Sequence, residues 1–272
     1  MPLLALCTAG LSAASPAEAS GTEVASSIPE GQQQVLFKSG TGGYGCYRIP
    51  TLVHTKDGSL LAFAEGRKAP SCGDRGDFDL VVRRSTNDGR TWSPIRVVPS
   101  GDVAPRAYGA GPVPAGMQAG SPVGRTNSAA VADLTSGTIY LLSTSNPVNN
   151  SYPRIPWVQE SRDYGLTWSR PTKLEVTLTS GAIGSNWFAT GPGHGIQLTG
   201  GAHHDRLVVG AHQKTQDGDY AGYLYMDPQA DGSAVWHGAQ RGECQAPGRR
   251  HRAGPDRLRG RQVAPGHSRA LG

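Results

Sequence analysis

A short turn motif occurs twice in the chain and constrains its fold more than any other feature. STNDGRTW at 85–92 and SRDYGLTW at 161–168 share a serine, an Asn or Asp, a glycine and a final Thr-Trp pair, 76 residues apart. The Asx side chain can fold back on backbone amides, and the glycine can adopt a positive φ. The tryptophan can then pack beneath the turn. Each motif follows a strand-like segment, so we interpret both as hairpin tips.

Short apolar segments bounded by Gly, Asp or Ser fill the sequence around these turns and predict an all-β fold. The chain has 38 glycines and 20 prolines in 272 residues, and no amphipathic helix of ten or more residues is evident. Repetition of a sheet-and-tip unit is typical of propeller blades. No run of about 18 apolar residues occurs, so we expect no membrane span. The expected strands are 59–67, 78–84, 137–145, 155–160, 193–200, 205–213 and 220–227.

The composition divides the chain into three parts. Residues 1–19 contain a short apolar run followed by Ala17-Glu18-Ala19, which fits the cleavage site of a secretory signal peptide, although a basic start is missing. The alternative is an alanine-rich, unstructured N-terminus. Residues 20–236 hold the repeated turns and strands. If the signal is real, the protein is secreted.

Residues 237–272 form an Arg/Gly/Pro-rich tail that we expect to be disordered or out of frame. The tail carries eight arginines and two acids, so the rest of the chain has a net charge of −1 although the whole has +5. Its few branched apolar residues cannot bury enough surface to order it. A nucleic-acid-binding arm is disfavoured, because no aromatic residue stands among the arginines for base stacking. A lost reading frame near residue 240 is the interpretation we favour.

The cysteines leave two possibilities open. Secretion would remove Cys7 and permit disulfides, with Cys46 and Cys72 as a candidate pair and Cys244 left over. Two free buried thiols at 46 and 72 are an equal alternative, since a pair alone fixes no connectivity.

Residues 33 to about 230 resemble the bacterial secreted exo-α-sialidases, whose turn motifs are called Asp boxes. The family implies a six-bladed β-propeller with its active site at the centre of one face. From the spacing of the two boxes we expect only the first three to four blades here. The resemblance is carried by YRIP at 47–50, AFAEGR at 62–67, GDRGDFDLVVRRS at 73–85, both Asp boxes and GPGHGIQL at 191–198.

The resemblance implies three substrate-binding residues. Arg48 matches the first of three family arginines that hold the sialic acid carboxylate, a task suited to a guanidinium because it forks onto a carboxylate and stays charged. Arg67 matches a further arginine near that carboxylate, but it could instead pair with Glu65 or Asp74. Asn127 matches a position lining the pocket for the N-acyl group, or it is a turn asparagine.

The resemblance also implies the catalytic residues. Asp74 matches the acid/base aspartate that protonates the departing oxygen and then activates water. Asp77 and Asp79 are rivals, and Asp79 alternates with apolar residues in a strand, which favours a structural role. Sialidases use a tyrosine nucleophile activated by a glutamate. GECQ at 242–245 resembles the segment bearing that glutamate and makes Glu243 the candidate.

The nucleophilic tyrosine and the other two clamp arginines find no match. Tyr220, Tyr223 and Tyr225 come too early and lie in a strand pattern. We therefore expect a member of a retaining exo-α-sialidase family that acts on sialylated glycans, although this chain is catalytically incomplete. The alternatives are a non-catalytic glycan-binding module and a propeller fragment with a protein partner. We expect no cofactor and no metal, because His194 and the pair at 203–204 lack ligands at suitable spacing.

Overall fold

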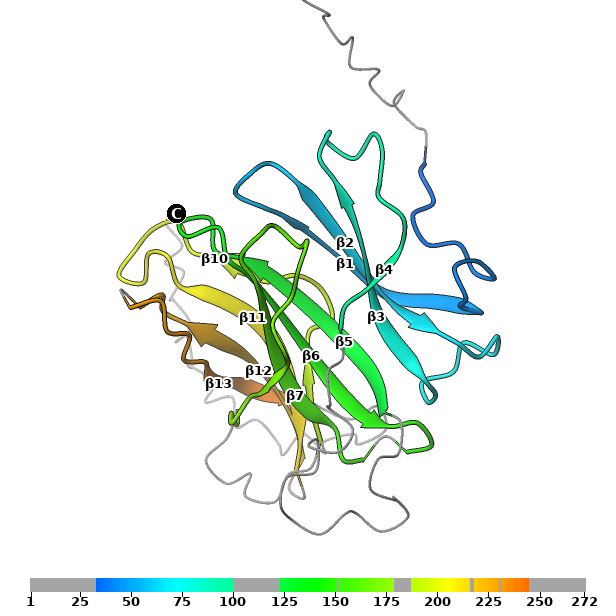
Figure 1. Cartoon of the computed structure of the whole chain (residues 1–272). Helices are drawn as coiled ribbons and strands as arrows, with labels where there is room; N and C mark the ends of the chain where they lie inside the picture. The colour runs from blue at the N-terminus through cyan, green and yellow to red at the C-terminus, as the bar shows by residue number, and fades with distance from the viewer. Residues whose placement is uncertain are drawn as a thin grey trace, which may run out of the picture. The chain divides into compact units, whose positions relative to one another are not determined.

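The computed structural model describes residues 33–99, 123–150, 152–178, 187–215, 218–229 and 231–244, and only the backbone of 240–244. These ranges contain β-strands and no helix, which confirms the all-β prediction. The strands form three antiparallel sheets (Figure 1). The expected signal peptide, residues 1–19, lies outside the described ranges.

The first sheet has four strands in sequential order, as a meander does. Its second strand is buried along almost its whole length, which follows from the continuous apolar sequence LLAFA. The strands are β1 (Cys46–His54), β2 (Leu60–Arg67), β3 (Phe78–Ser85) and β4 (Arg96–Val97).

The second sheet repeats this order and forms the centre of the described structure. All nine residues of its second strand are buried, because the sheet is covered on both faces. The strands are β5 (Val123–Ala132), β6 (Ile139–Pro147), β7 (Ile155–Ser161) and β8 (Thr172–Lys173).

The first strand of the third sheet is divided into two pieces, and both pieces pair with the same neighbouring strand. The strands are β9 (Trp187–Thr190), β10 (Ile196–Gln197), β11 (Leu207–Lys214), β12 (Asp219–Met226) and β13 (His237–Cys244). Three sheets agree with the expected three to four blades.

Two apolar cores join the sheets. In Figure 1, β5 lies between the first sheet and the strands of the third. One core joins the first and second sheets, and the other joins the second and third. Because the second sheet contributes alternating residues to both cores, it packs as a central layer. The two cores include Phe63, Leu80, Ala130 and Leu141, and Ala129, Leu142, Val209 and Leu224.

Both turn motifs adopt the expected hairpin tip. In the first motif, Gly89 has φ +79° and donates its amide to the Ser85 hydroxyl, while Trp92 donates its indole N–H to the Gly89 carbonyl. In the second, the Trp168 ring packs edge-to-face on Phe63 of the first sheet, with 5.8 Å between ring centroids. The second motif therefore also ties its own sheet to the preceding one.

The first strand of each sheet bends at a corresponding position. Ile49 and Asn127 both have φ +53°, and Gly191 has φ +63°. The pairing register of β1 with β2 and of β5 with β6 shifts at these residues. A left-handed conformation costs an L-residue about 1–2 kcal/mol, most clearly a β-branched one such as Ile49. Strain of this kind concentrates at functional sites, and the bends of β1 and β5 line the cavity described below.

The tail that was expected to be disordered or out of frame begins with a strand. Residues 237–244 form β13 and pair with β12. The reason is that an antiparallel ladder uses backbone groups, which a polar, glycine-containing segment also possesses. Residues 245–272 lie outside the described ranges. Within the described part of the chain, no helix is long and apolar enough to cross a membrane.

Candidate active site

A cavity of about 440 Å³ opens where β1, β5 and β9, the first strands of the three sheets, come together. Four basic and two acidic side chains line it, which gives a net charge of +2 when all are ionised. Such a charge favours an anionic ligand. Its lining residues are Arg48, Ile49, Glu65, Arg67, Asp74, Thr126, Asn127, Tyr152, Arg154, Trp187 and Lys214.

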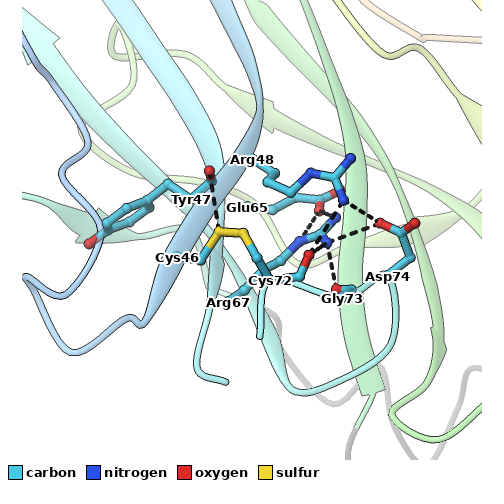
Figure 2. Close-up of a disulfide and its surroundings, with 8 residues drawn as sticks. All are labelled: Cys46, Tyr47, Arg48, Glu65, Arg67, Cys72, Gly73 and Asp74. Carbon is cyan, nitrogen blue, oxygen red and sulfur yellow. Dashed lines mark hydrogen bonds and ion pairs between the residues drawn. A yellow bond between two sulfur atoms is a disulfide. The ribbon is translucent and has the colours of Figure 1, made fainter. Parts of the chain in front are cut away.

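Arg48 points towards Asp74 across the mouth of this cavity. Its Nη1 donates to Asp74 Oδ1 at 2.8 Å, and Figure 2 shows the two side chains facing each other. The Arg48 side chain is 43% exposed and that of Asp74 76%. Arg48 is therefore a strand residue at the cavity that solvent or a ligand can reach.

Of the three candidate aspartates, Asp74 is the one that lines the cavity. Asp77 instead pairs with Lys68 at 2.8 Å, and Asp79 accepts a hydrogen bond from the Tyr44 hydroxyl at 2.8 Å. Neither of these two lines the cavity. The Asp74 pKa lies below its usual range, because Arg67 donates a hydrogen bond to it and the charge of Arg48 adds to this, against slight desolvation.

Arg67 makes both of the ion pairs that the sequence offered as alternatives to substrate binding. Its side chain is 3% exposed, and its guanidinium carbon lies 4.6 Å from the centre of the Phe78 ring. The guanidinium donates to Glu65 Oε2 (3.0 and 2.6 Å), Cys72 O (2.9 Å), Gly73 O (2.5 Å) and Asp74 Oδ1 (3.0 Å). Because protein acceptors face all three of its nitrogens, Arg67 is placed to hold Asp74 rather than to receive a ligand directly.

Glu65 connects the first sheet to the bend of β5. Its Oε1 accepts the backbone N–H of Asn127 at 2.8 Å, and its carboxyl group is buried. Burial raises the pKa of Glu65, whereas the Asn127 amide and Arg67 oppose that rise. This carboxylate therefore fixes two cavity residues at once.

Asn127 lies within β5 rather than in a turn, and it lines the cavity. It occupies the bend of β5 with φ +53°. Its Oδ1 accepts a hydrogen bond from Arg154 Nη1 at 2.9 Å, and its carbonyl accepts one from the Thr190 hydroxyl at 2.7 Å.

An aromatic and basic wall of the cavity was not predicted from the sequence. The Arg154 guanidinium lies 4.8 Å and the Lys214 ammonium 5.2 Å from the centre of the Trp187 ring. His212 packs against the same indole at 4.7 Å. Burial lowers the pKa of Arg154, and the charges of Glu65 and Asp74 oppose this. The sequence predicted the strand that follows Arg154. It could not predict that Arg154 contacts Trp187 of β9, because the two residues are far apart in the chain.

Of the candidate residues, Glu243 is described by its backbone alone. Its backbone lies on β13, opposite Tyr220 of β12, and its side chain is outside the described part. Tyr220, Tyr223 and Tyr225 all lie on β12, as a strand pattern predicted.

Of the two possibilities for Cys46 and Cys72, the structure contains the disulfide. Cys46 and Cys72 are bonded, with their Cα atoms 5.5 Å apart, beside Arg48 and Asp74 (Figure 2). Among the described residues, no group of three or more His, Cys, Asp or Glu side chains is arranged to hold a metal ion.

Comparison with known proteins gives the family. Residues 58–249 match the model of the BNR repeat-like domain. A sialidase of Micromonospora viridifaciens is 33% identical over 223 residues, which is 75% of this chain and 31% of that protein. An exo-alpha-sialidase of Aspergillus fumigatus is 34% identical over 192 residues, 60% of this chain and 42% of that protein. The chain thus spans about a third to two fifths of the length of these relatives.

Solved structures agree with this assignment. The Hadza microbial sialidase Hz136 has a TM-score of 0.57 and 26% identity over 75% of this chain and 38% of its own. The NanB sialidase of Streptococcus pneumoniae, at 14% identity, has a TM-score of 0.57 over 78% of this chain and 47% of its own and supports the fold alone. The described sheets thus form part of a sialidase-type β-propeller, and the chain belongs to the BNR repeat-like family, in which its relatives are sialidases.

Proposed function

We propose that this chain is part of an exo-α-sialidase that removes terminal sialic acid from glycoconjugates with retention of configuration. The observation that carries the proposal is a cavity of net positive charge with the accessible Arg48 at its mouth. Sialic acid presents a carboxylate, and a guanidinium can hold a carboxylate through two parallel hydrogen bonds.

Arg48 is better suited to receive that carboxylate than Arg67. Both of its hydrogen bonds within the described part of the chain, to Asp74 and to the Cys72 carbonyl, use Nη1. Its Nε and Nη2 can therefore donate to a ligand. Arg67 is buried and surrounded by acceptors, so its role is to keep Asp74 at the mouth of the cavity.

Asp74 is suited to acid catalysis only after substrate has bound. Its lowered pKa keeps it ionised in the empty site at neutral pH, whereas a general acid must carry a proton. A substrate carboxylate on Arg48 would compete for that guanidinium and add a second negative charge. Both effects raise the pKa of a neighbouring carboxyl group, so substrate binding would favour protonation of Asp74.

The residues that complete catalysis in sialidases are only partly represented. Glu243 remains our candidate for the activating glutamate, and no tyrosine of this chain matches the nucleophile. We therefore propose that this chain of 272 residues binds sialic acid but does not hydrolyse sialosides at ordinary enzyme rates. A non-catalytic sialic-acid-binding module would use the same cavity and would likewise bind sialic acid without turnover.

The experiment measures binding of N-acetylneuraminic acid to the full-length chain by calorimetry. Arg48→Ala should weaken binding roughly tenfold or more, since a hydrogen bond to a charged group contributes about 1.5–3 kcal/mol. Arg162→Ala is the matched control, because Arg162 pairs with Glu160 and lies outside the cavity lining. Equal binding by wild type and Arg48→Ala would overturn the proposed role of Arg48.

A fluorogenic sialoside assay on the same proteins measures whether this chain turns over substrate. Turnover at ordinary enzyme rates would contradict catalytic incompleteness and establish a hydrolase. Binding without hydrolysis is the expected result for this chain. We further propose sialylated glycans as partners and secretion as the location, which the Cys46–Cys72 disulfide supports because such bonds persist in oxidising compartments.

A further inference from the structure

The loop that carries Asp74 is attached covalently to β1. It runs from residue 68 to residue 77, between β2 and β3, and the Cys46–Cys72 disulfide joins it to the first residue of β1. Each cysteine lies two residues before one member of the Arg48–Asp74 ion pair (Figure 2). The crosslink therefore fixes the backbone on both sides of that pair.

Apart from the hydrogen bonds that Arg48 and Arg67 donate to residues 72–74, few contacts anchor this loop to the sheet. Eight of residues 68–77 are exposed, and only Cys72 and Gly76 are half-buried. The loop is closed at its base by a hydrogen bond from the Lys68 amide to the Asp77 carbonyl and by the exposed ion pair between the same residues. Exposed ion pairs hold side chains weakly, and segments with few buried apolar contacts open readily.

The crosslinked end of the loop supplies three consecutive acceptors to the two arginines. Arg67 Nη1 donates to the carbonyls of Cys72 and Gly73 and to Asp74 Oδ1. Arg48 Nη1 donates to Asp74 Oδ1 and, at 3.4 Å, to the Cys72 carbonyl. These contacts require the chain at residues 72–74 to lie close to Arg48 of β1 and to Arg67 at the end of β2, and the disulfide keeps it there.

The backbone at the crosslink also needs an external restraint. Cys72 has φ +57°, a left-handed conformation that non-glycine residues adopt only when their surroundings impose it. This conformation directs the Cys72 and Gly73 carbonyls towards Arg67. Release of the Cys72 side chain would allow the more common conformations and turn these acceptors away.

We propose that Cys46 and Cys72 are positioning residues whose disulfide holds the 68–77 loop so that Asp74 stays between Arg48 and Arg67 at the mouth of the cavity. The catalytic importance of this placement rests on the proposed function. The placement itself is a property of the empty chain and can be measured without substrate.

The test compares the full-length wild type with the double variant Cys46→Ser/Cys72→Ser. The Asp74 pKa is measured by carbon-detected NMR titration, with Asp74→Asn identifying the signal, and amide hydrogen exchange is followed along the chain. In the double variant, the Asp74 pKa should rise towards the unperturbed value of about 3.9, because the carboxylate loses its arginine partners. The amides of Lys68 and Cys72, which donate hydrogen bonds to the Asp77 and Ala69 carbonyls, should exchange at least about tenfold faster, while those of β2 and β3 stay protected.

A stability-matched control separates positioning from a general loss of stability. Val53→Ala removes a buried side chain from β1 and leaves the disulfide intact. It should lower the melting temperature and leave the Asp74 pKa unchanged. If the double variant does not fold, the same titration is made on folded wild type after reduction with a dithiol, and reoxidation should restore the original pKa.

The outcomes distinguish this inference from the proposed function. An unchanged Asp74 pKa after loss of the disulfide, or an equal rise in Val53→Ala, would overturn the positioning role. If N-acetylneuraminic acid binds none of these proteins but the Asp74 pKa still depends on the disulfide, the proposed function fails and the positioning role stands.

Discussion

The buried pair of Glu65 and Arg67 offers the sharpest test of how the site is held together. The two side chains are 1% and 3% exposed. One carboxylate oxygen accepts two hydrogen bonds from Arg67, and the other accepts the amide of Asn127. In Glu65→Gln, one of these oxygens becomes an NH₂ group, which must face a donor. The change also leaves Arg67 with Asp74 as its remaining carboxylate partner.

The expected cost follows from this geometry. Breaking a buried ion pair by removing one partner costs about 3–5 kcal/mol, and we expect about 3 kcal/mol because Asp74 still compensates part of the charge. For a folded part of about 200 residues, 1 kcal/mol lowers the melting temperature by about 2–4 °C, so the shift should be about 6–12 °C. Urea denaturation and calorimetry measure both quantities.

The same substitution at a more exposed glutamate provides a control for Glu65→Gln. Glu160→Gln is the same chemical change in an exposed pair with Arg162, and it should alter the free energy of unfolding by less than about 0.5 kcal/mol. The double variant Glu65→Gln/Arg67→Met should lose less than the sum of the single losses, since it removes the uncompensated charge. A loss below about 1 kcal/mol for Glu65→Gln, or strict additivity in the double variant, would show that the pair does not hold the site.

Two further predictions concern the turns and the loop. Gly165→Ala should cost about 2–4 kcal/mol of unfolding free energy, because φ is +84° and the new Cβ would lie 2.7 Å from Leu61. Gly89→Ala, with φ +79° and its nearest contact at 3.6 Å, should cost only about 1 kcal/mol, and equal losses in urea would refute the packing argument. Asp74 has a lowered folded pKa, so its stabilisation is present above the unfolded pKa of about 3.9 and is lost as pH falls through the folded value. The melting-temperature difference between wild type and Asp74→Asn should therefore shrink between pH 6 and pH 2, and a constant difference would contradict the ion pairs.

The sequence by itself determined the fold class and most of the strands. The Ser–Asx–Gly–Thr-Trp pattern is local, and each of its hydrogen bonds joins residues at most four positions apart. Short apolar segments likewise reveal strands through their own composition, as β2, β3, β6, β7, β11 and β12 confirm. The limit of composition is visible at β13, whose pairing depends on β12 rather than on its own side chains.

Only the tertiary structure showed which partners each candidate residue contacts in the site. Arg48, Arg67, Asp74 and Asn127 do lie in one cavity, as the family resemblance implied. Their partners could not be deduced, because burial and orientation depend on segments far apart in the chain. Glu65 meets Asn127 across 62 residues, and the Arg154 and Lys214 side chains reach Trp187 from the residue before β7 and from the end of β11.

The disulfide shows the same division between local sequence and tertiary contact. The positions of Cys46 and Cys72 were equally compatible with a bond and with two thiols. Whether they join depends on a loop returning to β1 with the correct Cα separation, which is a property of three-dimensional geometry. Local chemistry thus specified the strands and turns, and long-range packing specified which charges meet in the site.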